Sequence, residues 1–113
     1  MNKRLIGASK EQLVTEYLID NNYVILERNY QTRTGEIDII AKDDKCIVFI
    51  EVKYRSSPRY GSSLDAVDYK KQQTIRHVAT IYLSTRYRSL DIPCRFDVIG
   101  IDGNNITHIK NAF

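Results

Sequence analysis

The sequence predicts an α/β fold with a mixed central β-sheet flanked by helices, in the order α-β-β-β-α-β-β. Two segments carry the apolar spacing of helices, and five short segments rich in isoleucine, valine or tyrosine are bounded by turn residues. The longer helix lies between the third and fourth strands, where it can serve as a crossover that lets the fourth strand run parallel to an earlier one. Helices then cover the sheet.

Length and composition narrow the class of protein before any motif is considered. The chain has 113 residues, enough for one domain over residues 1–113 and too few for two. Hydrophobic residues make up 42% of the chain and charged residues 27%, which favours a globular protein over a disordered one. The net charge of +3 is compatible with a nucleic-acid partner, but many proteins without one share it.

The sequence also bears on the cellular compartment. The first residues carry basic charges without the apolar run of a signal peptide, and no stretch approaches the ~20 apolar residues of a membrane-spanning helix. Cys46 and Cys94 lack metal-ligand spacing and fall inside predicted strands, where free thiols are common. We therefore expect a cytoplasmic protein without a membrane partner.

The first helix is expected over residues 9–20, after a loose start at residues 1–8. Ser9 and Gln12 fit a capping box, in which the serine caps the helix and the glutamine reaches back to its first backbone amide. The two asparagines at residues 21–22 form the turn that ends the helix.

Three strands follow this helix. The first is expected over residues 23–28, and residues 29–34 form a polar connection. Gly35 marks a bend or bulge before the second strand at residues 36–42. The third strand, residues 46–55, follows a short acidic turn, so the last two strands form a hairpin.

The register of this hairpin decides which charged residues meet. A turn centred on residues 43 and 44 sets Asp38 opposite Phe49 and diagonal to Glu51. A turn centred on residues 44 and 45 sets Asp38 directly opposite Glu51. Both registers place Asp38, Glu51 and Lys53 on one face, because side chains alternate along a strand.

The second half of the chain supplies the crossover and two more strands. A long helix is expected over residues 64–87, with Ser63 as its N-cap. Lys71 falls within its apolar stripe, where an amine is costly to bury without a partner. Strands at residues 94–101 and 106–110 flank a turn and close a last hairpin.

Four polar residues in this half receive structural assignments. Arg95 and Asp97 share one strand face, and we expect them to form a structural ion pair. His77 and His108 have no partner at metal-ligand spacing, and we expect them to be surface or packing residues.

The carboxylates of Asp38 and Glu51 are candidates for a metal site. Two carboxylates on facing positions repel each other unless a proton or a cation lies between them. Their flanking positions are strongly apolar, as expected for central strands. The alternative is an exposed strand face on which Lys53 forms a salt bridge with one of the two carboxylates.

These residues resemble the D…(D/E)XK signature of PD-(D/E)XK nucleases, with Glu51-Val52-Lys53 as the second element. The residue before Asp38 is Ile37 and not proline, at a position that varies in that superfamily. The whole chain resembles the small bacterial YraN-like proteins of uncharacterised role. The stretches that carry this second resemblance are Gly7, Glu11, Arg28-Asn29-Tyr30, Gly35-Glu36-Ile37-Asp38, Phe49 to Lys53, Lys71 and Arg95-Phe96-Asp97-Val98.

The resemblance implies a restriction-endonuclease-like fold and a divalent metal, Mg²⁺ or Mn²⁺. Asp38, Glu51 and the Val52 carbonyl would ligate the metal, and Lys53 would orient the attacking water. Likeness to Holliday-junction resolvases adds Glu11 as a further metal ligand. The alternative for Glu11 is an acidic residue favoured by the dipole of its helix.

The same resemblance implies contacts with nucleic acid. Lys71 would point its amine at the acidic cluster or the scissile phosphate, assisted by Gln72, whereas the alternative is a lysine whose stem packs on the core. Phosphates attract arginine without regard to base sequence. The arginines in or beside the loops around the hairpin are Arg28, Arg33, Arg55 and Arg59.

The functional hypothesis is a metal-dependent endonuclease that hydrolyses phosphodiester bonds in DNA, branched DNA among its substrates. One alternative is a nucleic-acid-binding module that does not cleave and serves in DNA repair, recombination or uptake. Another is an assembly protein that retains the fold as a scaffold. Likeness to junction-cutting nucleases implies a homodimer, because two-fold substrates suit two-fold proteins.

Overall fold

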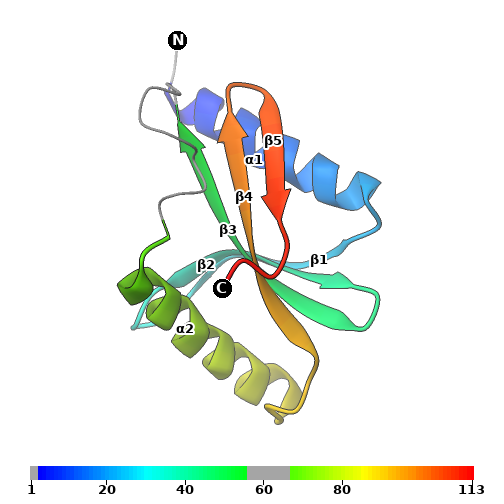
Figure 1. Ribbon diagram of the computed structural model, residues 1–113, viewed down its shortest axis with the longest axis vertical. Helices are drawn as coiled ribbons and strands as arrows, with labels where there is room; N and C mark the ends of the chain where they lie inside the picture. The colour runs from blue at the N-terminus through cyan, green and yellow to red at the C-terminus, as the bar shows by residue number, and fades with distance from the viewer. Residues whose placement is uncertain (1–2, 56–66) are drawn as a thin grey trace.

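The protein has an α/β fold built on a five-stranded mixed sheet with the strand order β1-β2-β3-β4-β5 (Figure 1). The computed structural model describes residues 3–55 and 67–113. Strands β1, β2 and β3 pair antiparallel, β3 and β4 pair parallel, and β5 is antiparallel to β4. The elements are α1 (Lys3–Asp20), β1 (Val24–Gln31), β2 (Glu36–Asp43), β3 (Cys46–Arg55), α2 (Tyr69–Tyr87), β4 (Cys94–Asp102) and β5 (Asn105–Ile109).

The predicted order of elements and the crossover are therefore confirmed. The connection that contains α2 joins β3 to β4, and these two strands run parallel. Neither helix in the described residues is long and apolar enough to cross a membrane.

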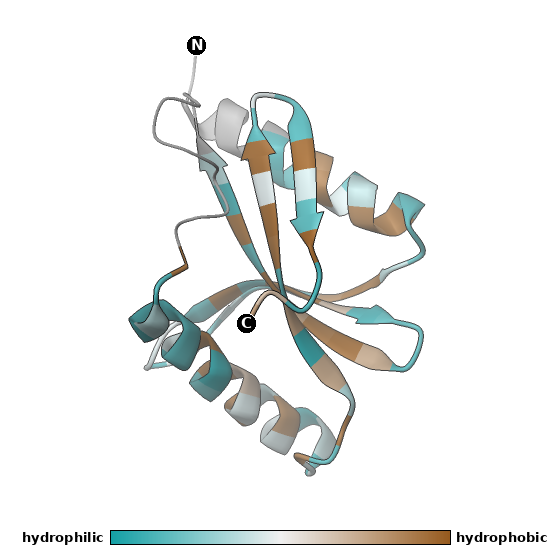
Figure 2. Cartoon of the chain, in the orientation of Figure 1, coloured by the Kyte–Doolittle hydropathy of each residue, from teal (hydrophilic) through white to brown (hydrophobic). Residues whose placement is uncertain are grey.

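Each helix covers one part of the twisted sheet with its own hydrophobic cluster. In Figure 1, α1 lies at the upper right and α2 at the lower left of the strands. The α1 cluster includes Val14, Leu18, Ile39, Val48, Ile50 and Ile99. The α2 cluster includes Ile40, Phe49, Ile75, Val78, Tyr82 and Phe96. Apolar residues, brown in Figure 2, run along β3 and β4 and recur along both helices, so the two clusters sandwich the central strands.

The β2–β3 hairpin adopts the second of the two registers considered from the sequence. Asp43 pairs with Cys46 and Ile39 pairs with Ile50, so the turn is centred on residues 44 and 45. Asp44 has φ 56°, in the left-handed region that aspartate tolerates better than most residues. This backbone conformation allows the tight turn and fixes which side chains face each other.

The predicted start of the first helix is wrong. Helix α1 begins at Lys3, so the Ser9–Gln12 pair lies inside the helix and does not cap it. The six residues before Ser9 include lysine, arginine, leucine and alanine, which are good helix formers, and they extend the helix N-terminally. The predicted end at Asp20 is confirmed.

The predicted start of the second helix is also wrong. Val67 and Asp68 are not helical, and α2 begins at Tyr69. The Asp68 side chain caps the helix by accepting a 2.8 Å hydrogen bond from the Lys71 backbone N–H. The proposed cap, Ser63, lies outside the described residues, as does the start at residue 64.

Strand β1 extends further than predicted. Residues 29–31, expected to be part of a polar connection, pair with β2 through Tyr30 opposite Ile37 and Gln31 opposite Glu36. Pairing with β2 overrides the weak strand preference of Gln31, and Tyr30 is a residue type that favours strands.

Gly35 allows the chain before β2 to approach α2 closely. A Cβ atom at this position would lie 2.5 Å from the Thr74 Cγ2 atom. We therefore expect Gly35→Ala to lower the free energy of unfolding by about 1–3 kcal/mol, measured by urea denaturation. In a Thr74→Ser background, which removes that methyl group, the same substitution should cost much less; an equal cost in both backgrounds would contradict the steric explanation.

Candidate functional site

Two carboxyl groups come together where β2 and β3 separate. The paired residues of the two strands end at Ile39 opposite Ile50, so Asp38 and Glu51 are the next residues along each strand. Past the last paired residues, Asp38 Oδ2 accepts a 2.8 Å hydrogen bond from the Val52 backbone N–H. The Asp38 side chain thus bridges the two strands where the backbone ladder stops.

Burial shifts the pKa of both carboxyl groups. Burial raises the pKa of Glu51 to about 7, and the neighbouring charge of Asp38 adds to the increase. Burial also raises the pKa of Asp38, although the Val52 N–H opposes the shift. Interaction with Glu51 lowers the pKa of Asp38, and interaction with Asp38 raises that of Glu51.

Two lysines lie beside this acidic pair. Lys71 Nζ of α2 is 3.9 Å from Glu51 Oε1, and Glu51 is only 7% exposed. Lys53 lies two residues after Glu51 in β3, and the charges of both lysines lower the pKa of Glu51. The fold therefore brings four of the sequence-predicted site residues together, one from β2, two from β3 and one from α2.

This donor set fits a hard divalent cation. Adjacent carboxylate oxygens are the ligands that Mg²⁺ and Mn²⁺ favour, and a cation between Asp38 and Glu51 could offset the repulsion between their charges. Within the described part of the chain, however, no group of three or more His, Cys, Asp and Glu side chains is gathered closely enough to hold a metal ion. The two carboxylates are thus a partial ligand set.

Glu11, the expected third carboxylate, has a different partner. Its Oε2 atom accepts a 3.1 Å hydrogen bond from Arg28 Nη2. Glu11 and Arg28 nevertheless line the same cavity as Asp38, with a volume of about 280 Å³. Glu36, on the exposed part of β2, also lines this cavity and accepts a hydrogen bond from Gln31.

The residues expected to contact nucleic acid do not form one group in the described part of the chain. Arg33 is exposed in the β1–β2 loop. The Gln72 side-chain amide donates a 3.1 Å hydrogen bond to the Val67 carbonyl, which ties it to the backbone before α2. The Arg55 side chain and Arg59 lie outside what the structure describes.

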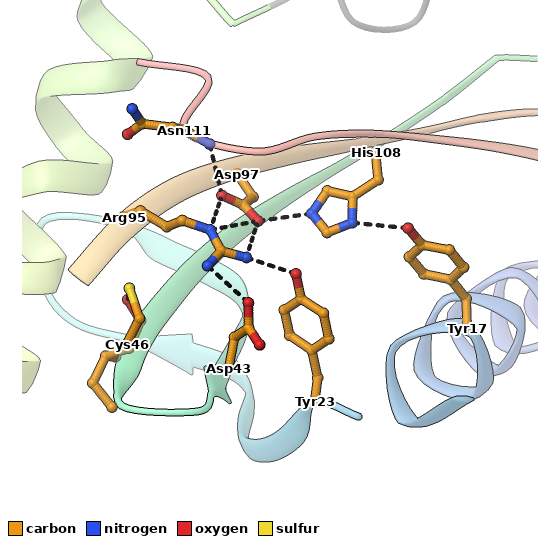
Figure 3. Close-up of polar contacts among 9 residues, drawn as sticks. Tyr17, Tyr23, Asp43, Cys46, Arg95, Asp97, His108 and Asn111 are labelled. Carbon is orange, nitrogen blue, oxygen red and sulfur yellow. Dashed lines mark hydrogen bonds and ion pairs between the residues drawn. The ribbon is translucent and has the colours of Figure 1, made fainter. Parts of the chain in front are cut away.

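A second buried polar cluster surrounds Asp97, which is fully buried (Figure 3). Arg95 Nε donates to Asp97 Oδ1 at 3.0 Å, which confirms the predicted structural pair. His108 Nε2 lies 2.7 Å from Asp97 Oδ2, and the Asn111 backbone N–H donates to Oδ1 at 3.0 Å. His108, expected to be a surface or packing residue, packs against the rings of Tyr17 and Tyr23 and also contacts Asp97.

The cluster extends to the first half of the chain. Arg95 also donates to Asp43 Oδ2 at 3.0 Å and to the Tyr23 hydroxyl at 2.6 Å. His108 Nδ1 lies 2.9 Å from the Tyr17 hydroxyl (Figure 3). These bonds join α1, the β2–β3 turn, β4 and β5, which indicates a structural role for the buried charges.

One sequence signal could have placed His108 beside Asp97. The turn between β4 and β5 sets His108 opposite Ile99, and Asp97 lies two residues from Ile99 on the same face. His108 and Asp97 are therefore diagonal neighbours in the hairpin. The spacing of histidines alone does not reveal this relation.

Comparison with known proteins identifies the family. Residues 10–101 match the family model described as uncharacterised protein family UPF0102. A UPF0102 protein of Alkaliphilus oremlandii is 51% identical, with 100% of both chains covered. A second, of Thermodesulfovibrio yellowstonii, is 46% identical over 96% of this chain and 95% of its own. The chain therefore belongs to UPF0102, the uncharacterised family that its sequence resembles.

Proposed function

We propose that the protein is a metal-dependent endonuclease of the PD-(D/E)XK type that hydrolyses phosphodiester bonds in DNA, branched DNA among them. The observation that carries the proposal is the convergence of Asp38 and Glu51 where the pairing of β2 with β3 ends. Lys53 and Lys71 supply positive charge beside them. The mixed sheet with a helical crossover supports the fold assignment, which is an analogy.

Each residue has a role in the proposed reaction. Asp38, Glu51 and the Val52 carbonyl would hold Mg²⁺ or Mn²⁺. The bound metal would supply a water of lowered pKa and would neutralise phosphate charge. Lys53 would orient the attacking water and offset the negative charge that develops on the phosphate. Lys71 would lower the pKa of Glu51 by its proximity and so favour the charged form that holds a metal.

Contacts with the DNA backbone fall to basic residues around the hairpin. Arg33 and Arg55 would bind phosphates without reading the base sequence, and Gln72 could reach the backbone if its bond to Val67 were exchanged. A second copy of the chain would place two such sites on a two-fold DNA junction.

One observation favours a second candidate, a nucleic-acid-binding module that does not cleave. In the described residues the acidic pair has no third carboxylate close enough to complete a metal site. Such a module would bind DNA through the same basic residues and would serve in repair, recombination or uptake. Its affinity would fall steeply as the salt concentration rises, while the DNA remained intact.

Calorimetric titration of Mn²⁺ into the purified protein tests the proposal without a guess about the DNA substrate. We expect binding to wild type and no binding to Asp38→Ala, because that change removes one of the two converging carboxylates. Glu36→Gln is the matched control, since it removes a carboxylate from the same strand outside the pair, and it should retain binding. Equal binding by wild type and Asp38→Ala would refute the metal site; intact DNA together with salt-dependent DNA affinity would favour the second candidate.

A further inference from the structure

Glu11 and Arg28 form an ion pair at the edge of the proposed site. Arg28 Nη2 and Glu11 Oε2 are 3.1 Å apart, and the two side chains are 42% and 57% exposed, respectively. Glu11 lies on α1, whereas Arg28 lies on β1. Both line the cavity that Asp38 also lines, so the pair lies beside one of the proposed metal ligands.

The pair is weak enough to exchange. A solvent-exposed ion pair gains little from its Coulomb attraction, because water screens the charges and holding two long side chains costs entropy. A phosphate group offers the guanidinium a stronger, bidentate partner. If Arg28 binds a phosphate, the Glu11 carboxylate is released inside the same cavity as Asp38.

The released carboxylate would not approach Asp38 unaided. Two carboxylates brought close together repel each other, so the Glu11 carboxylate would stay apart from that of Asp38. A divalent cation removes this repulsion and gains Glu11 as an additional oxygen ligand. Phosphate binding and metal binding would then favour each other, since each supports the same rearrangement.

We propose that Arg28 is a positioning residue that holds Glu11 away from the metal ligands until a DNA phosphate takes its place. The arginine thereby couples the arrival of a phosphodiester to completion of the metal site. This inference rests on the proposed function, because it requires a metal at Asp38 and Glu51.

The first test is a thermodynamic cycle of Mn²⁺ affinity in the absence of DNA. Arg28→Gln should bind Mn²⁺ about two- to fivefold more tightly than wild type, since Glu11 is released without a phosphate. In a Glu11→Gln background, Arg28→Gln should bring no gain. A gain that persists without Glu11 would show a general charge effect and would overturn the proposal.

Lys10→Gln is the matched control for general charge. Lys10 lines the same cavity, but its amine donates to the Gly103 carbonyl and not to Glu11. Its removal should change Mn²⁺ affinity by the same factor with and without Glu11. A dependence on Glu11 as strong as that of Arg28→Gln would contradict the specific role of Arg28.

The second test measures coupling with DNA directly. A fluorescent single-stranded oligonucleotide is titrated with and without Ca²⁺, which allows binding while disfavouring cleavage. Wild type should bind the oligonucleotide more tightly with Ca²⁺, and Arg28→Gln should lose most of this difference. If Mn²⁺ binding depends on Asp38 but Arg28→Gln changes neither the Mn²⁺ affinity nor the effect of Ca²⁺ on DNA affinity, the proposed role of Arg28 is refuted and the proposed metal site stands. If Mn²⁺ does not bind wild type at all, the metal site and the role of Arg28 are both refuted.

Discussion

Replacing Asp97 with Ala is expected to lower the free energy of unfolding by about 3–5 kcal/mol, because the change breaks a buried ion pair by removing one partner. Arg95, His108 and the Asn111 backbone N–H all lose their shared acceptor. The Arg95 side chain is only 17% exposed and that of His108 only 5%, so water cannot fully replace the lost bonds. Urea denaturation followed by circular dichroism at pH 7 measures the loss.

Asp91→Ala provides the control for this prediction. Asp91 is an exposed carboxylate in the segment between α2 and β4, and its loss should change the free energy of unfolding by less than about 0.5 kcal/mol. A cost below about 1 kcal/mol for Asp97→Ala would show that its partners find other acceptors, and the cluster would then not be a structural anchor.

The same carboxylate should influence stability at acidic pH. Burial alone would raise the pKa of Asp97, but hydrogen bonds from His108, Arg95 and the Asn111 N–H lower it overall. The stability that comes from the charged form is therefore present above the unfolded-state pKa of about 3.9 and is lost as the pH falls through the folded-state value. Asp97→Asn should lack this acid-dependent part, so its difference from wild type should shrink below about pH 4.

Replacing Lys53 with Met is expected to reduce DNA cleavage about 10²- to 10⁴-fold if the proposed function holds. Methionine keeps an unbranched apolar stem in β3 but removes the amine that would orient the water and offset charge on the phosphate. Mn²⁺ affinity should not fall, because the substitution removes a positive charge close to the carboxylates. Initial cleavage rates on branched, single-stranded and duplex DNA, with Mg²⁺ present, measure the effect.

Lys45→Met separates this role from a general loss of charge. Lys45 is exposed at the turn of the same hairpin, at the opposite end from the carboxyl pair. It should leave the cleavage rate close to that of wild type. A full cleavage rate in Lys53→Met, or weaker Mn²⁺ binding in that variant, would remove Lys53 from the proposed mechanism.

The central part of the site could be predicted from the sequence because its geometry is local. Alternation along two strands and a short turn suffice to place Asp38 and Glu51 on one face, and β3 has the predicted bounds, Cys46–Arg55. The choice between the two registers could not be made, since it depends on Asp44 adopting a positive φ that other turn residues could also adopt.

The outer part of the site depends on packing between distant segments. The Glu11–Arg28 pair requires the position of α1 over β1, which no local pattern specifies. The start of α2 depends on Asp68, one of several residues before the helix with a side chain able to cap it. Equivalent local signals compete at the helix starts, which explains why both predicted starts are wrong. The predicted bounds of β3 are correct.

The separation of β2 from β3 gives the protein a built-in spectroscopic probe. The Val52 amide hydrogen bonds to the Asp38 carboxylate and not to a backbone carbonyl of β2. Its chemical shift and its exchange with deuterium therefore depend on the charge and orientation of a single side chain. A nuclear magnetic resonance signal from one backbone amide thus reports the state of the acidic pair.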